Sequence, residues 1–297
     1  MEIGRLLTAM VTPFDSEGKV DYGQAKRLAL ALLDSGSDGV VVAGTTGECP
    51  TLTNDEKVTL FRELKDAIGD RGCVVAGSGT YNTAESIELS REAEAAGADG
   101  LLLTTPYYSR PPQEGLFRHF EAIAAETSLP CIIYNIPGRT AVNLTAETQI
   151  RLAEIPNIAG AKESSGDLVQ ISEIIEGAPH YRIWSGDDQL TLPILAVGGY
   201  GVISVAAHLV GLQMRRMVEA QLDGNTSEAS AIHRRLMPLM QILMTAAPNP
   251  ISVKYALNQI GFRAGGFRLP LVEPDEAAAE RIMAVVSRQQ IDLAVAV

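Results

Sequence analysis

The stretch Ser35-Gly36-Ser37-Asp38-Gly39-Val40-Val41-Val42 shows the pattern that decides the fold. The same pattern returns 61 positions later as Ala96-Gly97-Ala98-Asp99-Gly100-Leu101-Leu102-Leu103. In both copies, small residues and a glycine that would stop a helix lead directly into a short apolar run typical of a buried strand. The two copies therefore indicate a repeated unit in which a helix is followed by a strand.

Short apolar runs of this type occur along the first two thirds of the chain, with helical patterns between them. The runs that we predict as strands are residues 6–10, 39–43, 73–76, 100–104, 131–134, 158–162, 181–184 and 201–205. Strands that alternate with helices at this density indicate parallel pairing. Eight such strands favour an α/β fold of the closed (β/α)8 type, a TIM barrel, over the alternative of an open doubly wound sheet.

Local signals place some helix starts and the end of the barrel. Thr53 with Glu56, and Asn82 with Glu85, have the spacing of capping boxes. After about Ala207 no further strand is indicated, and only helical patterns continue. We expect residues 1–224 to form the catalytic barrel and residues 225–297 to form a C-terminal helical region packed on it, which covers a face or makes an oligomer contact.

The composition limits the classes of partner. The chain has 297 residues, 46% of them hydrophobic and 20% charged, and a net charge of −12. Excess negative charge disfavours binding to nucleic acid or to anionic membranes, so small molecules are the expected partners. Residues 189–213 carry no formal charge, but Pro193 and several glycines break this stretch into a short helix, a turn and a strand. The N-terminus shows no signal-peptide pattern.

Cysteine and histidine usage argues against structural cross-links. The three cysteines, Cys49, Cys73 and Cys131, show no CxxC spacing, and the four histidines form no HExxH pair. Neither a disulfide framework nor a zinc site is indicated, and a reducing cytoplasm fits this usage.

Lys162 is the first candidate for chemistry. In a (β/α)8 barrel, the active site lies at the carboxyl ends of the strands. Lys162 ends the apolar run 158–161 at the turn into a helix, where a Schiff-base lysine is expected. A lysine amine in water is almost fully protonated at pH 7, and burial is the usual way to raise its neutral, nucleophilic fraction. The alternative is a lysine that ends its strand in solvent.

Other strand ends carry residues that suit the same chemistry. Gly44-Thr45-Thr46-Gly47 could present backbone N–H groups to a carboxylate, or could be a simple glycine-rich turn. The Tyr134 hydroxyl could relay protons at Lys162, or could only pack. Arg139 could hold a second carboxylate, or could form an ordinary surface ion pair. Tyr107-Tyr108, in a proline-bounded loop, fits packing or an interface equally well.

Together, these residues resemble the dihydrodipicolinate synthase family of pyruvate-dependent class I aldolases. The resemblance covers nearly the whole chain, and its motifs occur in the family's order. They are Thr12-Pro13-Phe14, Gly44-Thr45-Thr46-Gly47-Glu48, Thr105-Pro106-Tyr107-Tyr108, Tyr134-Asn135-Ile136-Pro137-Gly138-Arg139-Thr140, Lys162-Glu163, Gly201-Val202-Ile203-Ser204 and Pro248-Asn249-Pro250.

The resemblance implies a reaction and its chemical steps. Lys162 would form a Schiff base with pyruvate, and the resulting enamine would attack the aldehyde of L-aspartate-4-semialdehyde, in the diaminopimelate route to lysine. The protonated imine is itself the electron sink, so no metal or organic cofactor is implied.

The resemblance also implies the roles of single residues. Thr45, Tyr134 and Tyr108 would form a proton relay, with Tyr108 inserted from a neighbouring subunit of a homotetramer that is a dimer of dimers. The backbone N–H groups of Thr45 and Thr46 would hold the carboxylate of pyruvate. Three further residues complete the expected pocket: Arg139 for the carboxylate of the semialdehyde, with Gly186 and the carbonyl of Ile203 as lining.

Two alternatives and one departure accompany this interpretation. An aldolase for N-acetylneuraminate or a 2-keto-3-deoxy sugar acid would share the lysine and the tyrosine, but Arg139 argues against it. A noncatalytic barrel that binds a keto acid is less consistent with the presence of lysine, tyrosine and arginine together. Asn54, Lys57 and Tyr81 depart from the pattern of lysine-inhibited members, so we expect weak or absent feedback inhibition by lysine.

Overall fold

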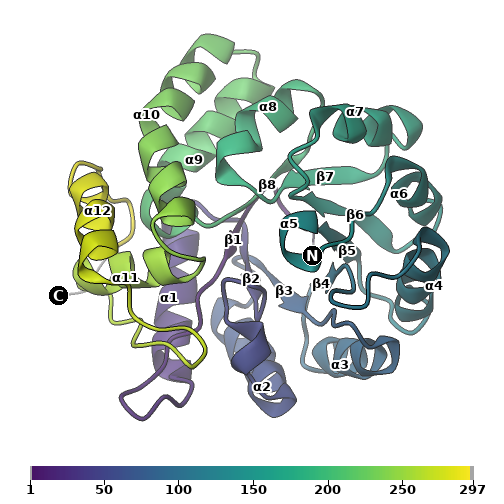
Figure 1. Ribbon diagram of the computed structural model, residues 1–297, viewed down its shortest axis with the longest axis horizontal. Coiled ribbons are helices and arrows are strands. Elements are labelled where there is room, and N and C mark those ends of the chain that lie inside the picture. The colour runs from purple at the N-terminus through teal and green to yellow at the C-terminus, as the bar shows by residue number, and fades with distance from the viewer. Residues whose placement is uncertain (1, 295–297) are drawn as a thin grey trace.

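The computed structural model describes residues 2–294 and contains a closed barrel of eight parallel strands, paired in chain order from β1 to β8 (Figure 1). The barrel closes because β8 pairs with β1, with Leu7 opposite Ile203. The strands are β1 (Leu6–Ala9), β2 (Gly39–Val42), β3 (Cys73–Gly77), β4 (Gly100–Thr104), β5 (Cys131–Asn135), β6 (Ile158–Glu163), β7 (Arg182–Ser185) and β8 (Gly201–Ser204).

Helices surround this barrel, with at least one after each strand; a long loop joins β1 to its helix α1 (Figure 1). They are α1 (Tyr22–Asp34), η1 (Cys49–Thr51), α2 (Asn54–Ile68), α3 (Thr83–Ala95), α4 (Gln113–Ala124), α5 (Pro137–Thr140), α6 (Ala146–Leu152), α7 (Leu168–Gly177), η2 (Asp188–Leu190), α8 (Thr191–Ala196), α9 (Ala207–Leu222), α10 (Thr226–Thr245), α11 (Ile251–Gln259) and α12 (Glu276–Val286).

The predicted fold class is confirmed, and the open doubly wound alternative is wrong. All eight predicted strands form, and each end lies within one residue of its expected position. The uncharged stretch contains a short helix, α8, and the strand β8, as its proline and glycines indicated. Among residues 2–294, no helix has both the length and the apolar character needed to cross a membrane.

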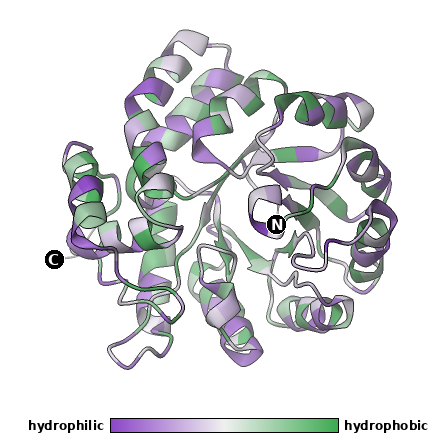
Figure 2. Ribbon diagram, in the orientation of Figure 1, coloured by the Kyte–Doolittle hydropathy of each residue, from purple (hydrophilic) through white to green (hydrophobic). Residues whose placement is uncertain are grey.

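Two apolar layers hold the barrel together. Inside it, alternate strand residues form a buried cluster that includes Leu102, Tyr134, Trp184 and Ile203. Outside it, the opposite strand faces pack against the helices in a larger buried cluster. Figure 2 shows the hydrophobic residues along the strands, with hydrophilic residues in patches on the surrounding helices. The lumen is therefore filled with side chains, and open space is left only at the strand ends.

The repeated aspartate of the two echoing motifs ties neighbouring strands together at their amino ends. Asp38 accepts hydrogen bonds from the backbone N–H groups of Arg5 and Leu6, at 2.8 and 2.9 Å. Asp99 accepts one in the same way from Val74, at 2.9 Å. Each carboxylate also pairs with a cation, Asp38 with Arg215 and Asp99 with Lys65. The motif thus gives each repeat a polar link to the adjacent strand.

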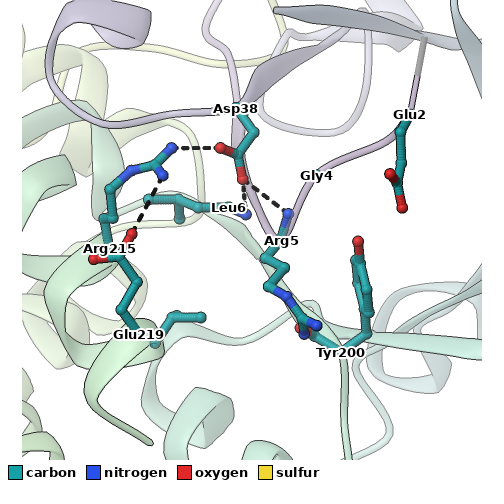
Figure 3. Close-up of a pocket in the computed structure, with 9 residues that line it drawn as sticks. Glu2, Gly4, Arg5, Leu6, Asp38, Tyr200, Arg215 and Glu219 are labelled. Carbon is teal, nitrogen blue, oxygen red and sulfur yellow. Dashed lines mark hydrogen bonds and ion pairs between the residues drawn. The ribbon is translucent and has the colours of Figure 1, made fainter. Parts of the chain in front are cut away.

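Asp38 lines a cavity of about 490 Å³. Figure 3 shows the residues around it. Its lining comes from the amino ends of β1 and β8 and from α9, including Arg5, Tyr200 and Arg215. The guanidinium of Arg5 lies 4.3 Å from the centre of the Tyr200 ring and donates to the Tyr200 carbonyl. Polar groups at this end of a barrel are paired with one another and contribute to stability, so we place the chemistry at the other end.

One of the two predicted capping boxes forms at a helix start. Thr53 and Glu56 form a complete capping box at α2. At α3 the box expected for Asn82 and Glu85 is wrong: Asn82 caps the helix, but its own N–H donates to the Thr80 hydroxyl. The Thr80 hydroxyl also donates a hydrogen bond of 3.3 Å to the Glu85 carboxylate. Thr80 therefore satisfies both the Asn82 N–H and the Glu85 side chain, which a capping box would have paired with each other.

The C-terminal helices α10, α11 and α12 lie against one side of the barrel, next to α9 and α1 (Figure 1). The boundary between residues 224 and 225 remains a prediction, and the last three residues of the expected helical region, 295–297, lie outside the described residues.

Candidate active site

Lys162 lies inside the barrel near the carboxyl end of β6. It pairs in register with Tyr134 on one side and Trp184 on the other, and only 5% of its surface is exposed. Its Nζ lies 4.2 Å from the centre of the Tyr134 ring. Within residues 2–294, this amine makes no hydrogen bond and no ion pair. A lysine that ends its strand in solvent is therefore excluded, and the buried amine is free to react.

Gly186 borders the Lys162 side chain, and Ile203 lies in the same lumen. A Cβ atom built on Gly186 would lie 3.0 Å from both Cγ and Cε of Lys162 and 2.1 Å from the Ser164 hydroxyl oxygen. Glycine is thus required here, because any side chain would press on the nucleophile. Ile203 is fully buried in the lumen cluster that also contains Tyr134.

The loop after β2 lies across the barrel from β6, since three strands lie between β2 and β6 on each side of the ring of eight. In the described chain, the backbone N–H groups of Thr45 and Thr46 donate to no other residue, whereas those of Glu48 and Cys49 close the turn at Thr45 and Gly44. Two adjacent free N–H groups suit a carboxylate oxygen. The Thr46 hydroxyl is buried and accepts a hydrogen bond of 3.0 Å from Asn249.

A buried ion pair that the sequence analysis missed supports this loop. Glu48, which has a left-handed backbone with φ of +57°, bonds to Lys254 of α11 at 2.7 Å, and both side chains are fully buried. The Lys254 amine lies 4.1 Å from the centre of the Phe14 ring. Burial lowers the pKa of Lys254 to about 8, although Glu48 acts in the opposite direction. The C-terminal region thus holds the loop that contains Thr45 and Thr46.

A cavity of about 610 Å³ opens at the carboxyl ends of β2 to β5. Thr45, Thr104, Tyr107 and Arg139 line it, and it continues to Lys57. Lys162 and Tyr134 do not line this cavity; they lie beside it in the lumen, where Thr104 pairs with Tyr134 across β4 and β5.

Arg139 stands in this cavity as an unpaired cation. It belongs to the short helix α5 and is exposed. It forms no ion pair and no side-chain hydrogen bond within residues 2–294. Arg139 therefore does not form the ordinary surface ion pair considered as an alternative, at least within residues 2–294. Its guanidinium is available to an anionic ligand.

Tyr108 is the one predicted residue that the fold does not bring to the others. Its side chain is 94% exposed, and its φ of +73° is a strained value for a tyrosine. Its neighbour Tyr107 instead turns into the cavity and packs edge-on against Tyr81, with ring centres 5.1 Å apart. Within one chain, Tyr108 does not contribute to the site.

Behind the two strands that carry Tyr134 and Lys162 lies a second group that the sequence analysis left without a role. Glu163 is 1% exposed and accepts hydrogen bonds from Asn135, Gln149 and Ser165. Burial raises the pKa of this carboxyl, and the three side-chain hydrogen bonds oppose the rise. Among residues 2–294, no set of three or more His, Cys, Asp or Glu side chains is placed to hold a metal ion.

Comparison with known proteins gives one consistent answer. A family model described as the dihydrodipicolinate synthetase family matches residues 2–289. A protein of Moorella thermoacetica named 4-hydroxy-tetrahydrodipicolinate synthase is 57% identical over 287 residues, which cover 96% of this chain and 98% of that protein. A crystal structure of the dihydrodipicolinate synthase of Cyanidioschyzon merolae with lysine bound is 46% identical and has a TM-score of 0.94. The match covers 97% of this chain and 99% of that chain.

A further similar structure is described as that of the first monomeric dihydrodipicolinate synthase variant. It is 37% identical, with a TM-score of 0.93 and 96% of each chain covered. Similarity thus extends over nearly the whole chain, and one of the similar proteins is described as monomeric.

Proposed function

The chain belongs to the dihydrodipicolinate synthetase family, and we propose from this that Lys162 is its Schiff-base nucleophile. The activity is that of a 4-hydroxy-tetrahydrodipicolinate synthase, a lyase of the diaminopimelate route to lysine, as named for relatives from 51% to 57% identical. The observation that carries the assignment of Lys162 is its buried amine, which lies 4.2 Å from the Tyr134 ring and has no competing partner within residues 2–294.

The first step joins pyruvate to the enzyme. The neutral amine of Lys162 attacks the ketone carbon, and the carbinolamine that forms loses water to give the imine. Protons must reach the departing oxygen and leave the nitrogen, and Tyr134, the register partner of Lys162 on β5, carries a hydroxyl suited to this transfer. Thr45 extends the relay toward the cavity, where it lies in the wall.

The carboxylate of pyruvate binds at the opposite side of the lumen. The free N–H groups of Thr45 and Thr46 point to this role, and the buried Thr46 hydroxyl is fixed by Asn249. Gly186 leaves room beside Lys162, and Ile203 gives an apolar wall. Holding the acid at one end and the imine at the other orients the methyl carbon, which becomes the nucleophile after proton loss.

The second step uses the cavity at the mouth. The enamine attacks the aldehyde carbon of L-aspartate-4-semialdehyde, whose carboxylate is held by Arg139. Arg139 thereby selects an aldehyde that carries an acid group. Sugar-acid aldolase activity and noncatalytic binding are not adopted, because the family model and the relatives at more than half identity carry the synthase name.

We also propose a homotetramer built as a dimer of dimers, in the cytoplasm. In this assembly Tyr108, exposed and strained in the single chain, would enter the site of a neighbouring subunit and complete its relay; its exposure and its φ of +73° support this role. Val169 and Val197 are exposed apolar residues at α7 and after α8, 70% and 37% accessible, and suit a second contact. The three free cysteines fit a reducing compartment.

The test of this function is borohydride trapping with pyruvate, followed by peptide mapping and a coupled assay with the semialdehyde. We expect a pyruvate adduct on Lys162, turnover with both substrates, and loss of both in Lys162→Arg. Lys57→Arg, which changes another buried lysine, serves as the matched control and should retain the adduct. An adduct on another lysine, or none, would contradict the assignment.

A further inference from the structure

Glu163 and Asn135 directly follow Lys162 and Tyr134, and the two lie opposite each other in the register of β5 and β6. Side chains alternate between the two faces of a strand, so these two point away from the lumen where the amine and the phenol lie. Both are buried, at 1% and 0% exposure. The pair therefore sits immediately behind the reacting groups without touching them.

The hydrogen bonds of Glu163 all come from neutral donors. Oε1 accepts from the Asn135 amide at 3.0 Å and from the Gln149 amide at 2.5 Å, while Oε2 accepts from the Ser165 hydroxyl at 2.7 Å. No cation pairs with this carboxylate in residues 2–294. A buried carboxylate without a cation is costly to the fold, so stability alone does not account for it.

Asn135 is fixed from both ends. Its amide nitrogen donates to Glu163, and its amide oxygen accepts from the backbone N–H of Leu144 at 3.0 Å. A side chain held in this way cannot rotate or slide without breaking a buried hydrogen bond. The backbone of the preceding residue, Tyr134, is held with it.

We propose that Glu163 is a positioning residue for the Schiff-base chemistry: its side chain, acting through Asn135, holds Tyr134 beside Lys162. The inference rests on the proposed function, because it uses the roles given there to Tyr134 and Lys162. The hydrogen bond joins the two strands at the first position beyond the reacting pair, so it fixes both their register and their separation. Displacement of a catalytic group by about 1 Å can cost a hundredfold in rate.

The test separates hydrogen bonding from charge and from general stability. Glu163→Leu removes the acceptor at similar size, and we expect kcat to fall at least tenfold while the KM for pyruvate stays within twofold, because the pyruvate carboxylate binds at β2. Glu163→Gln keeps an acceptor for Asn135 and can donate to the Ser165 hydroxyl, so it should retain kcat within threefold. Glu94→Leu removes a carboxylate that accepts from Thr127 and Ser128 far from the site, and should leave kcat unchanged.

Asn135→Ala breaks the same link from the other strand and should lower kcat at least as much as Glu163→Leu. Asn135→Ala also removes the bonds of Asn135 to Asn143 and Leu144, so the double variant should be no slower than Asn135→Ala alone, because the shared link to Glu163 is lost only once. If Glu163→Leu does not fold, Asn135→Ala carries the test alone. The proposal is overturned if either variant keeps kcat within twofold while folded, if Glu163→Gln falls as far as Glu163→Leu, or if the double variant shows additive losses. Trapping of pyruvate on Lys162 in the unaltered protein tests the proposed function separately.

Discussion

Lys254→Met should destabilise the protein severely, because it leaves a buried carboxylate without its partner. Lys254 and Glu48 are each fully buried and 2.7 Å apart. Methionine keeps the length of the aliphatic stem, so the change removes the charge and little volume. The remaining contact of Glu48 is a backbone N–H of Arg268 at 3.3 Å, which is a weak substitute.

The magnitude follows from the burial of the pair. Removing one partner of a buried ion pair costs about 3–5 kcal/mol. Unfolding entropy is about 2.1 cal/mol/K per residue, or about 0.6 kcal/mol/K for 297 residues, so Tm should fall by roughly 5–8 °C. The loop that Glu48 anchors also carries Thr45 and Thr46, and the KM for pyruvate should therefore rise.

Thermal unfolding at one protein concentration, followed by circular dichroism, measures the first effect, and steady-state kinetics measure the second. Glu48→Gln combined with Lys254→Met removes both charges and should recover most of the lost Tm, since replacing both members of a buried pair is often close to neutral. A fall of less than about 2 °C in the single variant would refute the reasoning, as would a double variant less stable than the single one.

Three other predictions concern the site and its surroundings. Arg139→Leu should raise the KM for the semialdehyde at least tenfold and leave borohydride trapping of pyruvate unchanged, and equal effects on both substrates would contradict the role of Arg139. L-lysine at about 1 mM should inhibit turnover by less than half, because the cation Lys57 lines the cavity and repels a cationic ligand; strong inhibition would refute this. Burial lowers the pKa of His208 to about 4 from 6.5, so its stabilising effect is complete above pH 6.5 and is lost as the pH falls toward 4. His208→Gln should reduce the stability difference between pH 7 and pH 4.5, measured by urea unfolding, by about 2–3 kcal/mol, and an unchanged difference would count against it.

The sequence predicted those features that depend on neighbouring residues. Each strand shows itself as a local apolar run, and a polar residue that ends a run must stand at the strand terminus. Lys162 and Tyr134 follow from this rule, and Arg139 follows from its place in the loop after Tyr134. The closed barrel followed from the number of strands, because eight parallel strands of this length can close on themselves.

The features that sequence reasoning missed join residues far apart in the chain. The ion pair of Glu48 and Lys254 spans 206 positions. One signal was available: Lys254 interrupts the otherwise uncharged segment of α11, Ile251-Ser252-Val253-Lys254-Tyr255-Ala256-Leu257, and a single lysine among such residues needs a partner. Nothing local identifies Glu48 as that partner. Tyr108 could not be placed for a different reason: its proposed site belongs to another subunit, so no contact within one chain reveals its role.

The two ends of the barrel differ in whether their cations are paired with carboxylates. This difference explains how a protein with net negative charge can bind two acids. At the amino ends, Arg215 pairs with Asp38 and Lys65 with Asp99, while Arg5 donates to the Tyr200 carbonyl. At the carboxyl ends, Lys162 and Arg139 have no carboxylate partner in residues 2–294. A net charge of −12 repels anions on average, but the electrostatic potential inside a cleft depends mostly on the nearest unpaired charges. The potential at the mouth is therefore set by cations left free for ligands, while the rest of the surface discourages larger polyanions.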